Sequence, residues 1–303
     1  SDITIVDDDQ VLVSVAARTV NEAAGTISFD VLLEGESESA VSIDFETRSA
    51  TAVAPGDYVS VATTTLTWAA GTTGAQQVSI DIVDDVIDEG AEGFDVVLSG
   101  PSGGLLIKSG LGVARVQITD NDTSEISIAT ASVTEDTGSV TVTVSLSTPS
   151  ASTVTVEYTT TDASSGNIAT GGTDYDLASG TLTFVPGDTT ATFDITITAD
   201  LVDELDEVFH ADIFNGVGAG VSTSRADVTI VDDDDVLLSI TDVTVTEGQV
   251  GTVDAVLTVS LNAQSDRTVT VDFATADIGS ANDPADFVGQ SGTLTFAPFE
   301  TSK

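Results

Sequence analysis

The stretch Val116-Gln117-Ile118-Thr119-Asp120-Asn121-Asp122 joins an alternating apolar and polar run to a block of acidic residues. Similar blocks occur at Asp7-Asp8-Asp9 and at Asp232-Asp233-Asp234-Asp235, and the three blocks start 113 and 112 residues apart. A spacing this regular is typical of an array of similar units. It also places carboxylates at one recurring structural position, which scattered surface charge does not do.

Further segments recur at the same period and define the units. They are Val20-Asn21-Glu22 with Val133-Thr134-Glu135 and Val245-Thr246-Glu247, Gly56-Asp57-Tyr58 with Thr173-Asp174-Tyr175 and Ala285-Asp286-Phe287, and Thr65-Leu66-Thr67-Trp68 with Thr181-Leu182-Thr183-Phe184 and Thr293-Leu294-Thr295-Phe296. We therefore expect the last strand of a preceding repeat at 1–9, complete repeats at 10–122 and 123–235, and a truncated repeat at 236–303.

Within each unit the hydrophobic period is two, as in Val140, Val142 and Val144. Such alternation predicts strands with one face on a core. The second unit contains seven such runs, at roughly 125–131, 138–147, 152–160, 180–185, 190–199, 206–214 and 224–231. Seven strands in a unit of this length indicate an immunoglobulin-like sandwich. The predicted fold is all-β, with tandem seven-stranded antiparallel β-sandwiches.

The composition excludes several classes of function. The chain has 50 acidic and 7 basic residues, a net charge of −43, and this argues against nucleic acid as a partner because phosphates need Lys and Arg. It also disfavours docking on anionic lipid. No apolar run reaches 18 residues, so we expect no membrane insertion of this segment. Cysteine is absent, which removes disulfides, zinc-thiolate sites and cysteine nucleophiles.

The sequence places many acids at one end of each sandwich, which we name the acidic pole. In an antiparallel sandwich, alternate connections and the exit of the last strand lie at the same end, and the acids fall in these places. In the first unit they are Glu22, Asp57, Asp84, Asp85, Glu89, Glu92, Asp120 and Asp122. In the second they are Glu135, Asp174, Asp200, Glu204, Glu207, Asp232, Asp233 and Asp234. Asp88 and Asp203, in the same loops, are interpreted as facing solvent.

Neighbouring carboxylates predict a bound cation. Two of them about 5 Å apart repel by roughly 3 kcal/mol at an effective dielectric constant near 20, and seven basic residues are too few to offset this. A hard divalent cation, with calcium as first choice, suits oxygen ligands. Calcium takes 6–8 oxygens, so eight acids predict more than one ion per complete repeat. The third unit keeps only Glu247 and Asp286, and we expect its pole to hold no ion.

These motifs in combination resemble the Calx-β repeat, known from sodium–calcium exchangers, integrin β4 and many bacterial surface proteins. The carriers are the Val-x-Glu segments, the Asp-Tyr pairs, the loop from Asp84 to Phe94 and the exit at Asp232. The resemblance covers essentially the whole chain. It implies that an acidic pole binds several calcium ions beside the next domain, and that the backbone carbonyls of Ile87 and Val202 also serve as ligands.

The acidic residues also have interpretations other than a metal site. An acidic surface suited to salt water or to high solubility is the alternative for the poles and the favoured reading for acids outside them, such as Asp30. Pairs of carboxylates also serve as acid and base catalysts, but these recur in each unit without a cleft-forming insertion, so we expect no enzyme. His210 is expected to point away from the core without a catalytic role, and Trp68 to pack in the core.

The leading hypothesis is a calcium-binding tandem-repeat segment of a large extracellular bacterial surface, adhesin or matrix protein. Calcium at the domain junctions would stiffen an extended rod, with neighbouring repeats and cell-surface or matrix ligands as further candidate partners. One alternative is a regulatory calcium-sensor module. Another is a non-catalytic module attached to an enzyme or a transporter.

Overall fold

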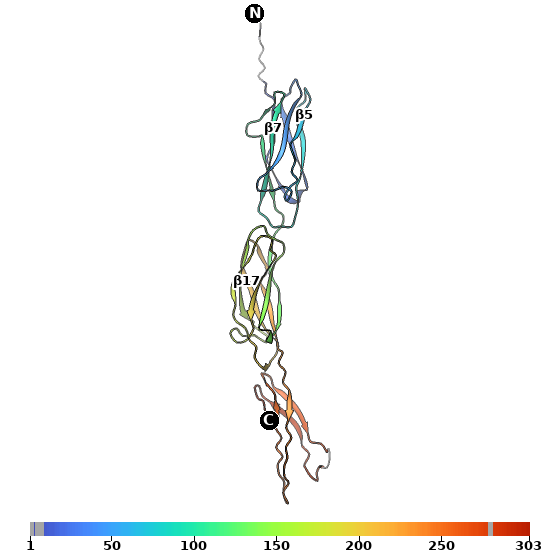
Figure 1. Cartoon of the computed structure of the whole chain (residues 1–303), viewed down its shortest axis with the longest axis vertical. Coiled ribbons are helices and arrows are strands. Elements are labelled where there is room, and N and C mark those ends of the chain that lie inside the picture. The colour runs from blue at the N-terminus through green and yellow to red at the C-terminus, as the bar shows by residue number, and fades with distance from the viewer. Residues whose placement is uncertain (1–2, 4–8, 278–280) are drawn as a thin grey trace.

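The computed structural model describes residues 3, 9–277 and 281–303, and its three β-rich units lie end to end (Figure 1). Each unit has a hydrophobic cluster of its own, drawn from residues 13–118, 126–230 and 259–296. The strand expected at 1–9 lies almost wholly outside the described residues. The described chain is all-β apart from two short 3-10 turns, η1 (Glu22–Ala24) and η2 (Glu135–Thr137).

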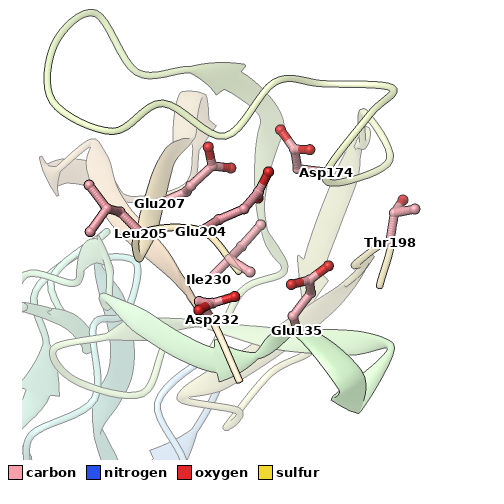
Figure 2. Close-up of a pocket in the computed structure, with 8 residues that line it drawn as sticks. All are labelled: Glu135, Asp174, Thr198, Glu204, Leu205, Glu207, Ile230 and Asp232. Carbon is pink, nitrogen blue, oxygen red and sulfur yellow. The ribbon is translucent and has the colours of Figure 1, made fainter. Parts of the chain in front are cut away.

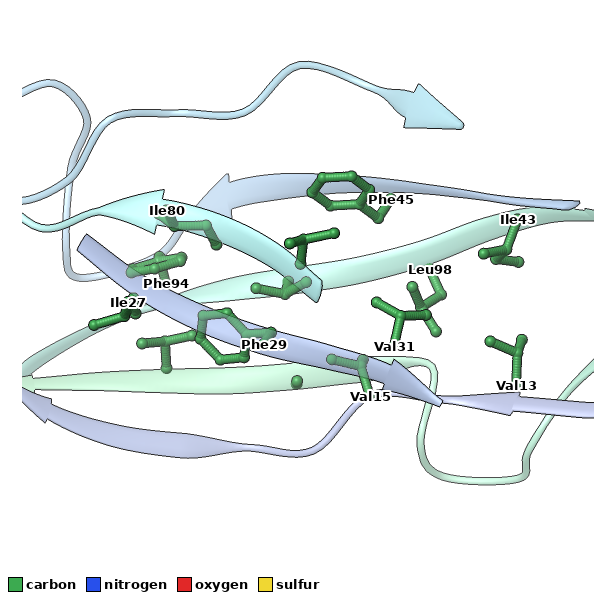
Figure 3. Packing of buried hydrophobic residues seen from close by; sticks show 14 of the residues in the cluster. Val13, Val15, Ile27, Phe29, Val31, Ile43, Phe45, Ile80, Phe94 and Leu98 are labelled. Carbon is green, nitrogen blue, oxygen red and sulfur yellow. The ribbon is translucent and has the colours of Figure 1, made fainter. Parts of the chain in front are cut away.

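The first unit is a sandwich of two sheets. Its strands are β1 (Leu12–Ser14), β2 (Arg18–Asn21), β3 (Thr26–Glu34), β4 (Val41–Ser49), β5 (Thr64–Trp68), β6 (Gly74–Asp81), β7 (Glu92–Ser102), β8 (Leu106–Ile107) and β9 (Val113–Thr119). One sheet has the order β6-β3-β1-β8 and the other β2-β9-β7-β4-β5. Figure 3 shows alternate residues of these strands, such as Ile27, Phe29 and Val31, packed between the sheets. Trp68 is 4% exposed, which confirms its predicted place in the core.

The second unit repeats this plan. Its strands are β10 (Glu125–Ile128), β11 (Ala131–Thr134), β12 (Ser139–Leu146), β13 (Val154–Asp162), β14 (Ser179–Phe184), β15 (Thr190–Thr196), β16 (Val202–Asp203), β17 (Glu207–Val217), β18 (Gly220–Thr223) and β19 (Arg225–Val231). The sheet orders are β15-β12-β10-β18 and β11-β19-β17-β13-β14. His210, on β17, places Nδ1 2.9 Å from Oδ1 of Asp227 on β19.

The first strand of each sandwich changes sheets halfway, which the alternation alone does not reveal. The run predicted at 125–131 holds β10, which pairs antiparallel with β12, and only the first residue of β11, which continues to Thr134 and pairs parallel with β19. In the first unit β1 and β2 divide in the same way. The second half of this strand therefore ends beside the exit of the last strand, and this brings Glu135 and Glu22 to the acidic poles.

The third unit is smaller. Its strands are β20 (Leu238–Ile240), β21 (Val259–Leu261), β22 (Gln264–Ser265), β23 (Val269–Ala274) and β24 (Ser291–Phe296). Its buried cluster is Val259, Leu261 and Phe296. The segment 241–258 forms no strand, although Val245-Thr246-Glu247 matches β2 and β11 in sequence. In the second unit β11 pairs with β19, and the described part of the third unit holds no strand equivalent to β19.

The interpretation of Asp88 and Asp203 as solvent-facing residues was wrong. Asp203 is 6% exposed and Asp88 is half-buried. Both lie where one unit touches the next: the Asp88 N–H donates to the Pro149 carbonyl at 2.9 Å, and β16 pairs with β22 of the third unit. The sequence of one repeat does not show that the following repeat covers these positions.

Candidate metal centres

The acidic pole of the first unit is built from four separate stretches of the chain. They are η1, the loop between β4 and β5, the loop between β6 and β7, and the exit from β9. A small pocket there is lined by Glu22, Asp57, Val83, Glu89, Gly90, Glu92, Ile118 and Asp120. Five carboxylates thus share one pocket with a few apolar walls.

Two groups of carboxylates can be distinguished at this pole. Glu22, Asp84 and Asp122 form one group, in which oxygens from the three residues lie within 4.8 Å of one another. Asp57, Glu89 and Glu92 form the second group by the same measure. Each group draws on more than one loop, so a cation held by either would tie separate loops together.

Main-chain amides hold several of these carboxylates in place. The Asp85 N–H donates to Glu22 Oε1 at 2.8 Å, and Glu22 is only 6% exposed. The Glu89 N–H donates to Asp120 Oδ2 at 2.9 Å, which connects the loop after β6 to the exit of β9. The Ile87 N–H donates to Asp85 Oδ1 at 2.8 Å, so Asp85 fixes the turn that carries the Ile87 carbonyl.

The second pole repeats this scaffold around a pocket that Figure 2 shows. Glu135, Asp174, Glu204, Glu207 and Asp232 line it, together with Thr198, Leu205 and Ile230. Oxygens of Glu135, Asp232 and Asp234 lie within 4.8 Å of one another. The Asp200 N–H donates to Glu135 Oε1 at 2.7 Å, and the Val202 N–H to Asp200 Oδ1 at 2.7 Å. Asp233 is exposed and lies in neither set.

Stacked aromatic rings set the positions of two acids at each pole. Tyr58 and Phe94 are buried with ring centroids 4.0 Å apart, and Tyr175 and Phe209 are stacked at 3.9 Å. Asp57 precedes Tyr58, and Glu92 lies two residues before Phe94. Because the rings lock the two chain segments together, the packing of the core carries these two carboxylates to the same place.

Burial and the crowding of carboxylates raise several pKa values at the poles. Burial, a hydrogen bond to Asp57 and the charges of Asp57 and Glu89 raise the pKa of Glu92 to about 7. In the second unit, burial followed by the charges of Asp174 and Glu204 raises the pKa of Glu207 to about 8. The pKa of Glu204 rises to about 7 through burial and the charges of Asp200 and Asp174.

The raised pKa values reflect burial and repulsion between carboxylates, and a bound cation would offset the repulsion. The hydrogen bond between the carboxyls of Asp57 and Glu92 needs a shared proton, and Asp174 and Glu207 make the equivalent contact. A proton shared between acids marks a place where positive charge is favoured. The donor set is entirely oxygen, which hard cations such as calcium prefer. The residues present therefore fit calcium.

Sequence reasoning missed the supporting role of two side chains. The Asn121 Oδ1 accepts the Ala23 N–H at 3.2 Å, so this amide connects η1 with the exit of β9. The Asp206 Oδ1 accepts the Asp232 N–H at 3.3 Å in the second unit. Asn121 stands where the other two acidic blocks have Asp8 and Asp233, and Asp206 has Ala91 at its place in the first unit.

The third unit keeps one turn of the pole. The Asn282 N–H donates to Asp286 Oδ2 at 3.0 Å, as the Val53 N–H does to Asp57 and the Thr170 N–H to Asp174. Glu247 and Asp286 are both exposed. Among the described residues of this unit, no three carboxylates come as close together as in the groups above.

Comparison with known proteins agrees with this geometry. The sequence model of the Calx-beta domain matches residues 7–122, 117–234 and 235–303. This chain belongs to the Calx-beta family. Calx-beta domains bind calcium, and the acidic clusters of this chain offer suitable ligands. They are non-catalytic binding or regulatory modules.

Similar proteins include a segment of a receptor and two solved structures. Adhesion G-protein coupled receptor V1 of Danio rerio is 32% identical over 106 residues, which cover 35% of this chain and 2% of the receptor. The crystal structure of CBD12 from CALX1.2 is 22% identical and covers 72% of this chain and 99% of its own, with a TM-score of 0.36. The apo-form Calx CBD1 domain is 28% identical and covers 38% of this chain and 100% of its own, with a TM-score of 0.35.

Proposed function

We propose that this chain is a calcium-stiffened spacer within a large extracellular surface, adhesin or matrix protein. One observation carries the proposal: the carboxylate group that includes Asp122 lies two residues before Ser124, which is fully buried. The Ser124 N–H donates to Asp88 Oδ2 at 2.8 Å, so the contact between units begins directly after the pole. Any change in charge at the pole therefore acts on the junction.

The carboxylates named above would hold calcium in two places at the first pole and around Glu135, Asp232 and Asp234 at the second. We infer that the backbone carbonyls of Ile87 and Val202 join the ligands, and that each complete repeat takes more than one ion. Bound calcium supplies the positive charge that shared protons supply without it. With neither, the acids ionise and repel, and the loops of the pole separate.

Several further points support an extracellular setting. The related segment belongs to an adhesion receptor, although the match spans only 2% of that protein. Calcium sites of extracellular modules bind with dissociation constants of roughly 10⁻⁴–10⁻³ M, which suits permanently filled structural sites. The absence of cysteine favours a bacterial surface protein, in which disulfides are often lacking. Within the described residues no helix has the length and apolar character to cross a bilayer.

Small-angle X-ray scattering of the whole chain tests this function. In excess calcium we expect the maximum dimension and the profile of an extended, stiff particle. After chelation we expect a broader distribution of intramolecular distances, because the poles repel and the junctions loosen. An identical profile in calcium and in chelator would show that calcium does not control stiffness.

A further inference from the structure

Both junctions between units are made by the same main-chain contact. The N–H of Asp88 donates to the Pro149 carbonyl at 2.9 Å, and the Ala151 N–H donates to the Asp88 carbonyl at 3.0 Å. At the second junction the Asp266 N–H donates to the Asp203 carbonyl at 3.1 Å. In each case an aspartate that lies between two acids of the pole forms a parallel bridge with a turn of the next unit. This turn lies between β12 and β13 in the second unit and between β21 and β23 in the third.

A serine hydroxyl completes each contact. Ser150 Oγ donates to the Asp88 carbonyl at 3.3 Å, and Ser265 Oγ donates to the Asp203 carbonyl at 3.1 Å. The two serines are only 3% and 2% exposed. The aspartate side chain adds a further partner: Asp88 accepts the N–H of Ser124, and Asp203 pairs with Arg267. We name this contact the aspartate joint, and the turn that receives it the serine turn.

The first unit contains a third serine turn, at residues 36–39. The hydroxyl oxygens of Ser37, Ser150 and Ser265 each accept the N–H two residues ahead, at 3.3, 3.2 and 3.1 Å. Their carbonyls each accept an N–H from the turn after β5, β14 or β24, donated by Gly71 at 2.8 Å, Gly187 at 2.9 Å and Phe299 at 2.7 Å. These three donors all have positive φ, so the supporting turn has the same backbone shape in the three units.

Ser37 keeps these hydrogen bonds but is less covered than its two counterparts. It is partly exposed, whereas Ser150 and Ser265 are buried beneath an aspartate of the preceding unit. Among the described residues, no group accepts a hydrogen bond from the Ser37 hydroxyl. We propose that the serine turn at 36–39 is a docking surface for another Calx-beta repeat, which inserts the aspartate that corresponds to Asp88. The inference rests on the geometry of the aspartate joint and not on calcium binding.

The charges around Ser37 make this docking surface weaker than the two occupied ones. Glu36 and Glu38 flank Ser37, where the second unit has Pro149 and Ala151. At the second junction Arg267 offsets the acids that meet there. Ser39 takes the place of Arg267 in the first unit, so docking at Ser37 relies on main-chain groups and on the hydroxyl. Neutral residues at positions 36 and 38 should therefore strengthen the docking of another repeat at this turn.

In the test protein a second copy of residues 10–122 takes the place of residues 1–9 and runs directly into Gln10. The joined ends then read Asp122-Gln10, which preserves the spacing at the natural junction. Because the chain has no cysteine, two introduced cysteines can carry spin labels for distance measurement by electron paramagnetic resonance. Thr67 and Thr183 are exposed at equivalent places on β5 and β14. Labels at Thr67→Cys in both copies report the new junction, and Thr67→Cys with Thr183→Cys reports the natural one.

We expect the new junction to give one narrow distance distribution, centred close to that of the natural junction. Ser37→Ala should broaden this distribution, just as the matched Ser150→Ala should broaden that of the natural junction. Asp88→Ala in the added copy should have the same effect. Glu36→Gln with Glu38→Gln should narrow the distribution at the new junction. Thermal unfolding of each variant in the unextended chain shows that the first unit still folds. A broad distribution in the extended chain, or a narrow one that neither Ser37→Ala nor Asp88→Ala alters, would overturn the proposal.

Discussion

Replacing Glu92 with glutamine should stabilise the calcium-free protein and destabilise the calcium-loaded one. Oxygens of Glu92, Asp57 and Glu89 lie within 4.8 Å of one another, and the pKa of Glu92 is raised to about 7. At pH 8 most Glu92 carboxyls are ionised and repel their neighbours. Glutamine keeps the shape of the side chain, removes the charge and can donate a hydrogen bond to Asp57.

The magnitude follows from the geometry. Two charges 4.8 Å apart repel by about 3.5 kcal/mol at an effective dielectric constant of 20. Partial exposure and salt reduce this, so we expect a gain of about 1–2 kcal/mol in the free energy of unfolding. For a domain of this size, 1 kcal/mol raises the melting temperature by roughly 4–8 °C. In calcium the sign reverses, because a site filled at a hundred times its Kd stabilises by about 2.7 kcal/mol.

Differential scanning calorimetry of the whole chain at pH 8, in chelator and in excess calcium, measures both effects. Asp30→Asn is the matched control, because Asp30 is exposed on β3 and lies outside both carboxylate groups. The control should stay within about 0.5 kcal/mol of wild type in both conditions. If Glu92→Gln melts lower than wild type in chelator, or keeps the full calcium-dependent increase, the proposed role of Glu92 is refuted.

Three further predictions use the same measurement. Without calcium the protein should be less stable at pH 8.5 than at pH 5. The pKa values of Glu204 and Glu207 are raised to about 7 and about 8, so protonation of these groups stabilises the folded state, and this contribution is lost as the pH rises to about 8. A melting temperature that is the same at both pH values would contradict this prediction. Glu89→Gln combined with Asp120→Asn should abolish most calcium-dependent stabilisation of the first unit, and an unchanged calcium shift would remove both residues from the site. Phe94→Ala should destabilise the first unit by about 3–5 kcal/mol, since this ring is fully buried, and a loss below about 1 kcal/mol would show that the aromatic stack does not support the pole.

The alternation and the repeat of the Asp blocks were enough to predict the sandwiches, because both are local or periodic signals. The change of sheet after Ile128 could not be predicted in this way, since a strand keeps its alternation when it passes from one sheet to the other. The segment 241–258 carries the sequence of a strand but has no pairing partner within the described chain. Strand formation there depends on the partner and not on propensity.

The acidic pole was foreseeable from topology, because alternate loops of an antiparallel sandwich meet at one end. Its division into two groups was not, since this depends on side-chain directions set by contacts such as Asp85 N–H to Glu22. The roles of Asp88 and Asp203 were missed for a different reason. Within one repeat they read as exposed loop acids, and only the next repeat gives them partners.

Calorimetric titration of the whole chain with calcium, and in parallel with magnesium, tests the central claim most directly. We predict that each complete repeat binds more than one calcium ion and that magnesium binds more weakly. Near pH 7 the heat should depend on the buffer, because binding displaces the protons held by Glu92, Glu204 and Glu207. Absence of calcium binding at millimolar concentration would contradict a cation site at the acidic poles. An unchanged number of bound calcium ions when Glu92 and Glu207 are both replaced by glutamine would contradict the part of the site that these two carboxylates form.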